Sequence, residues 1–151
     1  MASNLYHEGL RRIIDRAMSG NIDLLADTIK VLLIGTAYTP DKDHQFISDV
    51  SGSELSGTGY TGGFGGSGRK ALASKAIGKS DASDKAYFDA ADLTWTAINA
   101  GTVGYLVLAK EITNDGASPI ICCIDVSPDV ATNGGDYTVQ WHADGIFTLS
   151  S

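Results

Sequence analysis

Glycines between Gly57 and Gly68 form the most motif-like stretch of this sequence. Residues 57–62 match the spacing of the dinucleotide fingerprint, whose glycines let the backbone approach a pyrophosphate at a helix N-terminus. No predicted strand leads directly into them and no helical pattern follows, so the required context is missing. Residues 63–70 resemble a phosphate-binding loop, but Arg69 stands where that motif needs its lysine. We therefore interpret the stretch as a structural loop and predict no cofactor.

A second group with possible chemistry is Asp41–His44, which holds two carboxylates and an imidazole. A calcium loop that starts at Asp41 needs a glycine near its sixth position and a glutamate near its twelfth, where this chain has Phe46 and Gly52. A solvated turn after a strand is the better interpretation. Weak calcium binding at Asp41 and Asp43 remains open.

The adjacent cysteines, Cys122 and Cys123, are the only two in the chain. On a strand their side chains point to opposite faces, so they cannot easily pair with each other or ligate one metal. We expect small core residues that stay reduced, with a functional thiol as the alternative.

Catalysis requires a nucleophile next to a base, or two carboxylates with separated pKa values. The three histidines, His7, His44 and His142, lie in a predicted helix, in a turn and near the last predicted hairpin. None belongs to a recognisable serine or cysteine nucleophile motif. We therefore predict that the protein is not an enzyme and has no catalytic, cofactor-binding or metal-binding residues.

Both tryptophans alternate with apolar residues in the manner of half-buried strands. Trp95 alternates with Leu93, and Trp141 alternates with Val139. Core packing is the expected role of both. A carbohydrate-stacking platform is the functional alternative, and it requires several exposed aromatic side chains together.

One amphipathic helix is predicted near the N-terminus, from about Asn4 to Met18, with Gly20 placed to end it. Its apolar stripe recurs at spacings of three and four residues and comprises Tyr6, Leu10, Ile13, Ile14 and Ala17. We expect residues 1–20 to form an N-terminal helical segment and residues 21–151 to form a single β-rich domain. A β-domain does not need such a helix, so we expect the stripe to pack on the sheet or on a neighbouring subunit.

After residue 27 the pattern changes to short runs rich in β-branched and aromatic residues, separated by turn residues. The predicted strands are Thr28 to Thr36, Lys70 to Ile77, Ala86 to Phe88, Thr94 to Ile98, Val103 to Lys110, Ile120 to Asp125, Tyr137 to His142 and Ile146 to Leu149. The second half is predicted to be a meander of antiparallel hairpins. The fold class is therefore mainly β, an antiparallel β-sandwich or small barrel with one N-terminal amphipathic helix.

Composition narrows the functional classes. Apolar residues make up 43% of the 151 residues and charged residues 19%, which predicts a folded domain. A net charge of −7 without basic clusters argues against direct nucleic-acid binding. The longest apolar-rich run, Ile29 to Ala37, is too short to span a bilayer, so we predict no membrane contact. The N-terminus has no cationic region before an apolar stretch, which predicts synthesis and folding in a cytoplasm.

Several blocks in a fixed order resemble a group of small virion proteins of tailed bacteriophages, over about residues 22 to 148. The blocks are Asp27 to Leu33, Tyr38 to Asp41, His44 to Phe46, Glu54 to Tyr60, Phe88 to Trp95 and Ser118 to Ile121. The resemblance implies a particle component without catalytic residues, localised in a virion assembled in the host cytoplasm. It favours a capsid decoration or cement protein that stabilises the head. A tail or baseplate component that binds a host-surface glycan or protein is the alternative.

We also expect self-association, because an extra apolar helix and a long glycine segment are surfaces that one chain covers poorly. The expected partners are further copies of this chain, with a trimer as the expected oligomer, and the major capsid protein or other virion proteins. The glycine segment, residues 57–68, is expected to be mobile or to be held by another chain. The candidate interface residues are Tyr6, Leu10, Ile13, Ile14, Tyr60 and Phe64.

Overall fold

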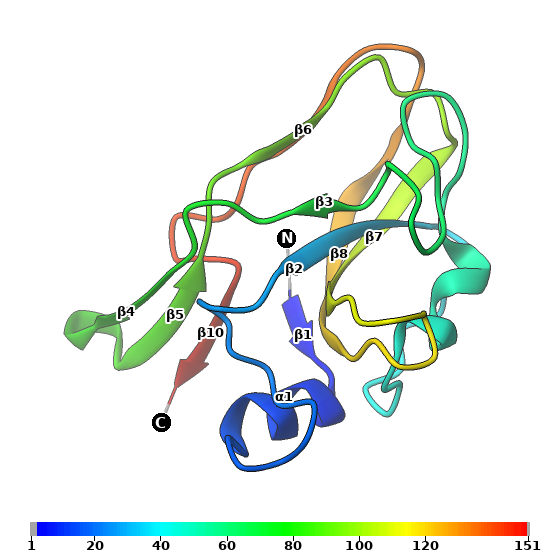
Figure 1. The fold of residues 1–151 in the computed structure, drawn as a ribbon. Helices are drawn as coiled ribbons and strands as arrows, with labels where there is room; N and C mark the ends of the chain where they lie inside the picture. The colour runs from blue at the N-terminus through cyan, green and yellow to red at the C-terminus, as the bar shows by residue number, and fades with distance from the viewer. Residues whose placement is uncertain (1–2, 151) are drawn as a thin grey trace.

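A computed structural model describes residues 3–150 of the chain, so the outermost residues of the predicted ranges 1–20 and 21–151 lie outside it. The fold is mainly β with antiparallel sheets and one helix near the N-terminus, which confirms the predicted fold class (Figure 1). The elements are β1 (Ser3–Leu5), α1 (His7–Ile14), β2 (Ile29–Gly35), β3 (Lys70–Ala71), β4 (Ala76–Ser80), β5 (Lys85–Asp89), β6 (Leu93–Trp95), β7 (Thr102–Lys110), β8 (Ile120–Ala131), β9 (Tyr137–Val139) and β10 (Phe147–Ser150), with short 3-10 turns at Ile47–Asp49, Ser51–Ser53 and Asp81–Ser83.

The central element is a five-stranded sheet with the order β1-β8-β7-β2-β3. Both of its faces are buried, which explains why β2 is apolar almost throughout and does not alternate. Val31 and Leu33 contribute to the larger core cluster, and Leu32 and Ile34 contribute to the smaller cluster on the other face. Cys122 and Cys123 divide between the two clusters in the same way, which confirms that their side chains point to opposite faces.

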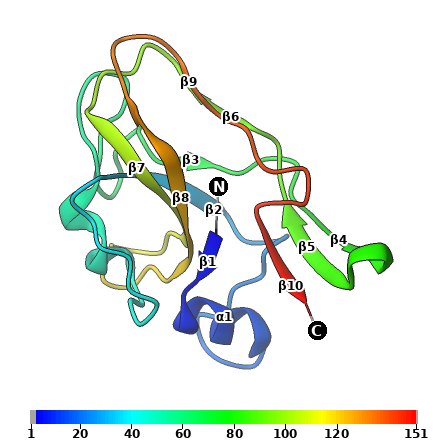
Figure 2. The ribbon, with the colours of Figure 1, turned by 180° about the vertical axis from the view of Figure 1, so that it is seen from behind.

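The second half of the chain is a set of nested pairs and not the predicted meander. The hairpin β7–β8 is innermost, β6 then pairs with β9, and β5 pairs with β10 (Figure 2). Two long arms of chain therefore run antiparallel, and β4 completes a three-stranded sheet, β10-β5-β4, at the far end of them. Turn residues mark where a strand ends, but they do not identify its partner, which is why the sequence suggested consecutive pairing.

The N-terminal region differs from the predicted helix of Asn4 to Met18. Residues 3–5 form β1, whose backbone pairs with β8, so the helix begins only at His7. It ends at Ile14, and the Asp15 carboxylate accepts a hydrogen bond from the Ala17 N–H at 3.1 Å, an alternative to continued helix. Gly20 has the expected positive φ of 76°, but it lies beyond the helix end. Residues 3–14 are thus an integral part of the β-rich body.

The predicted strand Lys70 to Ile77 is divided into β3 and β4. Ser74 adopts a positive φ of 52°, which breaks the extended conformation between the two. Lys75 then donates a hydrogen bond to the carbonyl oxygen of Asp27.

Within residues 3–150, no helix is long and apolar enough to cross a membrane.

Gly9 sets the distance between the helix and the central sheet. A Cβ atom at this position would lie 2.5 Å from the carbonyl oxygen of Ile120 and 2.8 Å from the Cα of Ile121, both of them backbone atoms of β8. We expect Gly9→Ala to lower the free energy of unfolding by about 1–3 kcal/mol, because the helix must move away from β8. Urea denaturation measures this, and Arg11→Ala at an exposed position of α1 is the control with little expected effect. Equal stability of the two variants would contradict the close approach.

Candidate functional site

Large apolar side chains that remain exposed define the candidate site. In residues 3–150 these are Ile14, Leu25, Phe64, Ile77 and Leu149, with exposed fractions of 69%, 49%, 48%, 54% and 42%. Single exposed apolar residues are ordinary on protein surfaces, and only their clustering carries information. Two of the five, Ile77 and Leu149, line one groove, Ile14 and Leu25 directly follow lining residues along the chain, and Phe64 is not among the lining residues.

The groove lies between the helical region and one face of the three-stranded sheet, where Figure 1 shows β4, β5 and β10 beside α1. It has a volume of about 190 Å³. Its walls are predominantly apolar and comprise Ile13, Leu24, Ile77, Ala86, Tyr87, Phe88, Phe147 and Leu149. Ile14 and Leu25 each follow a lining residue directly along the chain. We call this cavity the apolar groove.

Strand register explains why one wall of the apolar groove is so apolar. Phe88 of β5 lies opposite Ile77 of β4 and Phe147 of β10, while Ala86 lies opposite Leu149. Cross-strand partners share a face of the sheet, so these side chains form one continuous surface. Phe88 and Phe147 are buried with ring centroids 5.4 Å apart, whereas Ile77 and Leu149 are about half exposed. The core thus extends outward onto an uncovered sheet face.

The predicted interface residues divide into two groups. Tyr6 and Tyr60 are each only 1% exposed, so they are core residues of the monomer and offer no surface to a partner. The Tyr6 hydroxyl lies 2.9 Å from that of Tyr38. Leu10 and Ile13 are half-buried, while Ile14 and Phe64 are exposed. Hydrophobic type identified all six, but the fold buries the two tyrosines, Tyr6 in the smaller core cluster and Tyr60 in the larger one.

The glycine segment, residues 57–68, is held by its own chain, which corrects the expectation that it is mobile or needs another chain. Gly57 and Tyr60 form a tight bridge, and the Gly68 N–H donates to the Thr61 carbonyl oxygen at 2.9 Å. The Trp95 indole N–H donates to the Gly68 carbonyl oxygen at 2.7 Å. Trp95 is 1% exposed, as predicted for a core residue. The segment leads into strand β3 and not into a helix, so its structural context differs from that of a dinucleotide site.

A buried ion cluster that the sequence did not predict holds the base of this segment. Arg69 directly follows Gly68, and its guanidinium is inaccessible to solvent. All five of its N–H donors are used, by Glu54 at 2.7 and 2.9 Å, Asp115 at 2.7 and 3.1 Å and Glu111 at 2.9 Å. Lys30 adds a second cation to Glu111 at 2.8 Å. An arginine at the end of a glycine-rich stretch was the only local signal, because the acids come from two distant segments, one with Glu54 and the other with Glu111 and Asp115.

These contacts predict that acid destabilises the protein. Burial opposes ionisation of Glu111, but hydrogen bonds from Lys30 and Arg69 outweigh it and hold its pKa below the ordinary 4.5. Arg16 lowers the pKa of Asp23 to about 2, and Arg11 lowers that of Glu8. A lowered folded-state pKa contributes stability above the unfolded value and loses it as the pH falls through the folded value. We expect denaturant-measured stability to decline from about pH 5 towards pH 2, and a constant stability over that range would be contrary to this account.

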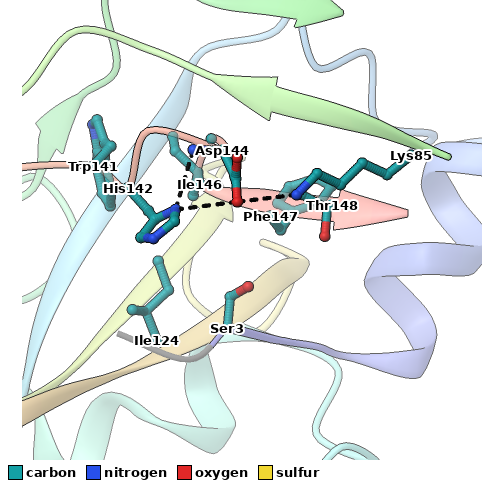
Figure 3. Close-up of a pocket in the computed structure, with 10 residues that line it drawn as sticks. Ser3, Lys85, Ile124, Trp141, His142, Asp144, Ile146, Phe147 and Thr148 are labelled. Atoms are coloured by element: carbon teal, nitrogen blue, oxygen red, sulfur yellow. Dashed lines mark hydrogen bonds and ion pairs between the residues drawn. The ribbon is translucent and has the colours of Figure 1, made fainter. Parts of the chain in front are cut away.

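A second, polar pocket lies beside β10 (Figure 3). Lys85 pairs with Asp144 at 3.0 Å and lowers the pKa of that carboxyl, and the Asp144 N–H donates to His142 Nδ1 at 3.1 Å. Trp141 and Ser3 also line the pocket. In the part of the chain that the structure describes, no hydrogen bond joins Ser3 to His142, and no three His, Cys, Asp or Glu residues are placed to hold a metal. The pocket offers an aromatic edge and an ion pair.

The carboxylates of Asp41 and Asp43 are directed at groups of the protein itself. Asp41 accepts a hydrogen bond from the Asp43 N–H at 2.9 Å, and Asp43 lies 2.9 Å from Nδ1 of His7. Both residues are exposed. This is the geometry of a solvated turn.

Comparisons of the chain with protein-family models, with curated proteins and with solved structures found no match. A functional assignment therefore depends on the apolar groove, the polar pocket and the resemblance of the sequence blocks.

Proposed function

We propose that this protein is a structural component of a tailed-bacteriophage virion, most specifically a capsid decoration or cement protein that stabilises the head. The proposal includes self-association and contact with the major capsid protein or another virion protein, and it includes no catalytic step, membrane contact or direct nucleic-acid contact. The clustering of exposed apolar side chains around one groove is the observation that carries it. The mainly β fold and the resemblance over about residues 22 to 148 support it.

Ile14 is the residue we assign to the contact with the head. It is 69% exposed at the end of α1, whereas the adjacent Ile13 is partly buried against the main core. A substitution at Ile13 would therefore change the stability of the fold as well as the affinity for heads. Burial of one isoleucine side chain contributes roughly 1.5–3 kcal/mol, which corresponds to a change of at least about tenfold in affinity.

The experiment measures binding of purified protein to heads that lack it, by co-sedimentation. We expect Ile14→Asp to fold like the parent, as judged by circular dichroism, and to bind heads at least about tenfold more weakly. Asn133→Asp is the matched control, because it adds the same charge at an exposed turn between β8 and β9. If Ile14→Asp and the control bind heads equally well, the helix is not the docking element. If the parent never binds heads but is found on tails, the head assignment is wrong.

The polar pocket of Figure 3 favours a second candidate, a tail or baseplate component that binds a host-surface glycan or protein. A partly buried indole ring beside a partly buried ion pair combines an aromatic surface with polar groups that can bind a sugar ring and its hydroxyl groups, although it supplies one aromatic ring where a stacking platform needs several. For this candidate we expect Trp141→Ala to reduce attachment of the purified protein to host cells. Undiminished attachment, or no attachment by the parent, would count against the tail candidate.

A further inference from the structure

We infer that the polar pocket of Figure 3 binds the terminal ring of an uncharged glycan, and that Asp144 and Lys85 recognise two neighbouring hydroxyl groups of that sugar. The inference rests on the second candidate of the proposed function, glycan binding, and does not depend on whether the protein lies on the head or on the tail. Acidic sugars are the class that the pocket should reject.

The polar pocket lies where the five-stranded and the three-stranded sheets meet. Ser3 of β1 and Ile124 of β8, which are cross-strand partners, line one side of it, and the turn that precedes β10 lines the other (Figure 3). That turn is fixed, because the Gly145 N–H donates to the His142 carbonyl oxygen at 2.8 Å and Gly145 has a positive φ of 99°. The pocket is therefore formed before a ligand arrives, which lowers the conformational cost of binding.

The charges that line the pocket cancel. Among the described residues around it, Lys85 and Asp144 are the only acidic or strongly basic ones, and their side chains pair at 3.0 Å. An anionic ligand would also meet the negative charge of the chain, because residues 111–151 include six acidic residues and no lysine or arginine. A cationic ligand would meet the ammonium group of Lys85. An uncharged polar ligand is therefore the best match.

The polar atoms around the ion pair match the hydroxyl groups of a sugar. A hydroxyl group both donates and accepts, so two neighbouring hydroxyls can donate to Asp144 while they accept from Lys85. Lys85 lowers the pKa of the Asp144 carboxyl, which keeps this group ionised as an acceptor. The Asp144 backbone N–H donates to Nδ1 of His142 at 3.1 Å, so the neutral imidazole carries its proton on Nε2. His142 thus offers one more N–H donor to a sugar oxygen.

Trp141 supplies the apolar contact. Its indole N–H donates to the Ala91 carbonyl oxygen at 3.0 Å and its backbone N–H donates to the Asp92 carboxylate at 3.0 Å, which holds the ring in one orientation. One aromatic ring is sufficient for one sugar ring, whereas a platform for an oligosaccharide needs several. The pocket volume of about 190 Å³ agrees with this, because an apolar protein cavity of about 150 Å³ holds one benzene molecule. A single terminal sugar is therefore the expected occupant.

NMR titrations of the isotope-labelled protein with free sugars test the ligand class. The neutral probes are the methyl glycosides of glucose, galactose, mannose and N-acetylglucosamine, and the acidic probes are glucuronic acid and N-acetylneuraminic acid. We expect at least one neutral probe to shift the indole N–H signal of Trp141, with a Kd on the order of millimolar, because a monosaccharide offers few atoms for contact. The acidic probes should bind at least about tenfold more weakly.

Variants identify the residues that select the sugar. We expect Asp144→Ala to weaken binding at least about tenfold, and Asp144→Asn, which keeps an acceptor oxygen, to lose less. Lys85→Met should also weaken binding, because it removes a donor. Asp129→Ala is the matched control, because Asp129 is exposed on β8 and does not line the pocket. Circular dichroism of every variant verifies the fold.

The absence of a shift with every neutral probe, or equal binding by Asp144→Ala and the control variant, would overturn the inference. Acidic probes that bind as tightly as neutral ones would overturn the selectivity. Attachment to host cells that depends on Trp141, without binding of any neutral probe, would refute the sugar assignment and leave the tail candidate in place. If neutral probes bind through Asp144 but the purified protein does not attach to host cells, the sugar site stands and the tail candidate fails.

Discussion

Replacement of Arg69 with methionine is expected to lower the free energy of unfolding by about 3–5 kcal/mol, as observed when one partner of a buried ion pair is removed. The Arg69 guanidinium is the hub for Glu54, Glu111 and Asp115, and among residues 3–150 Lys30 is the only other cation paired with them. Without Arg69, buried carboxylates lose their charge partner and their hydrogen-bond donors. Denaturant titration at neutral pH measures the loss.

The pH dependence distinguishes this electrostatic cause from lost packing. Arg69 helps to hold the pKa of Glu111 below its ordinary value, so that stabilisation is present above pH 4.5 and lost as the pH falls through the folded-state pKa. The difference between parent and Arg69→Met should therefore shrink on acidification. Arg69→Lys keeps the charge but not the planar guanidinium, so its free energy of unfolding should lie between those of the parent and Arg69→Met. Lys79→Met, at an exposed ion pair, is the control with no measurable change expected. A pH-independent loss would contradict the electrostatic explanation.

Replacement of Trp95 with alanine is the other change with a large expected effect, a loss of about 3–5 kcal/mol in the free energy of unfolding. Trp95 is 1% exposed, packs against Tyr60 and Tyr137, and donates its indole N–H to the Gly68 carbonyl oxygen. Its removal leaves a cavity beneath the glycine segment and an unpaired carbonyl. Trp95→Phe keeps most of the ring and should cost only about 1–3 kcal/mol, the penalty of the unpaired group.

Trp141 provides the matched comparison for Trp95. It also donates its indole N–H to a backbone carbonyl oxygen, that of Ala91 at 3.0 Å, but it is only partly buried. Trp141→Ala should therefore cost clearly less than Trp95→Ala in the same thermal or denaturant assay. Similar losses for the two tryptophans would show that Trp95 is not the support of the glycine segment.

The sequence predicted the features that depend on local periodicity. Short apolar runs between turn residues located most of the strands, and the adjacent cysteines were correctly placed on opposite faces because side chains alternate along any strand. The helix was also recognised, since Ile13 and Ile14 follow the helical period. Its length was overestimated at both ends, because residues 3–5 pair with β8, a tertiary contact that overrides local preference, and because the Asp15 side chain accepts a hydrogen bond from the Ala17 N–H just after the last helical residue.

Features that depend on distant contacts were not predictable. The partners of Arg69 lie 15, 42 and 46 residues away in the sequence, and no local pattern relates them. The same reason explains why Tyr6 and Tyr60 were proposed as surface residues: type and spacing do not show which apolar side chains the fold covers. The apolar groove itself became visible only once β5 was known to pair with both β4 and β10.

The most direct test of the central claim, that this protein coats a phage head, is its copy number in purified particles by quantitative mass spectrometry, with the major capsid protein as internal reference. A decoration protein covers a repeating lattice, so we predict hundreds of copies per particle and a loss of heat resistance in heads that lack them. A few copies or a few dozen would contradict the head assignment and favour the tail or baseplate candidate, and absence from the particle would contradict a virion role altogether.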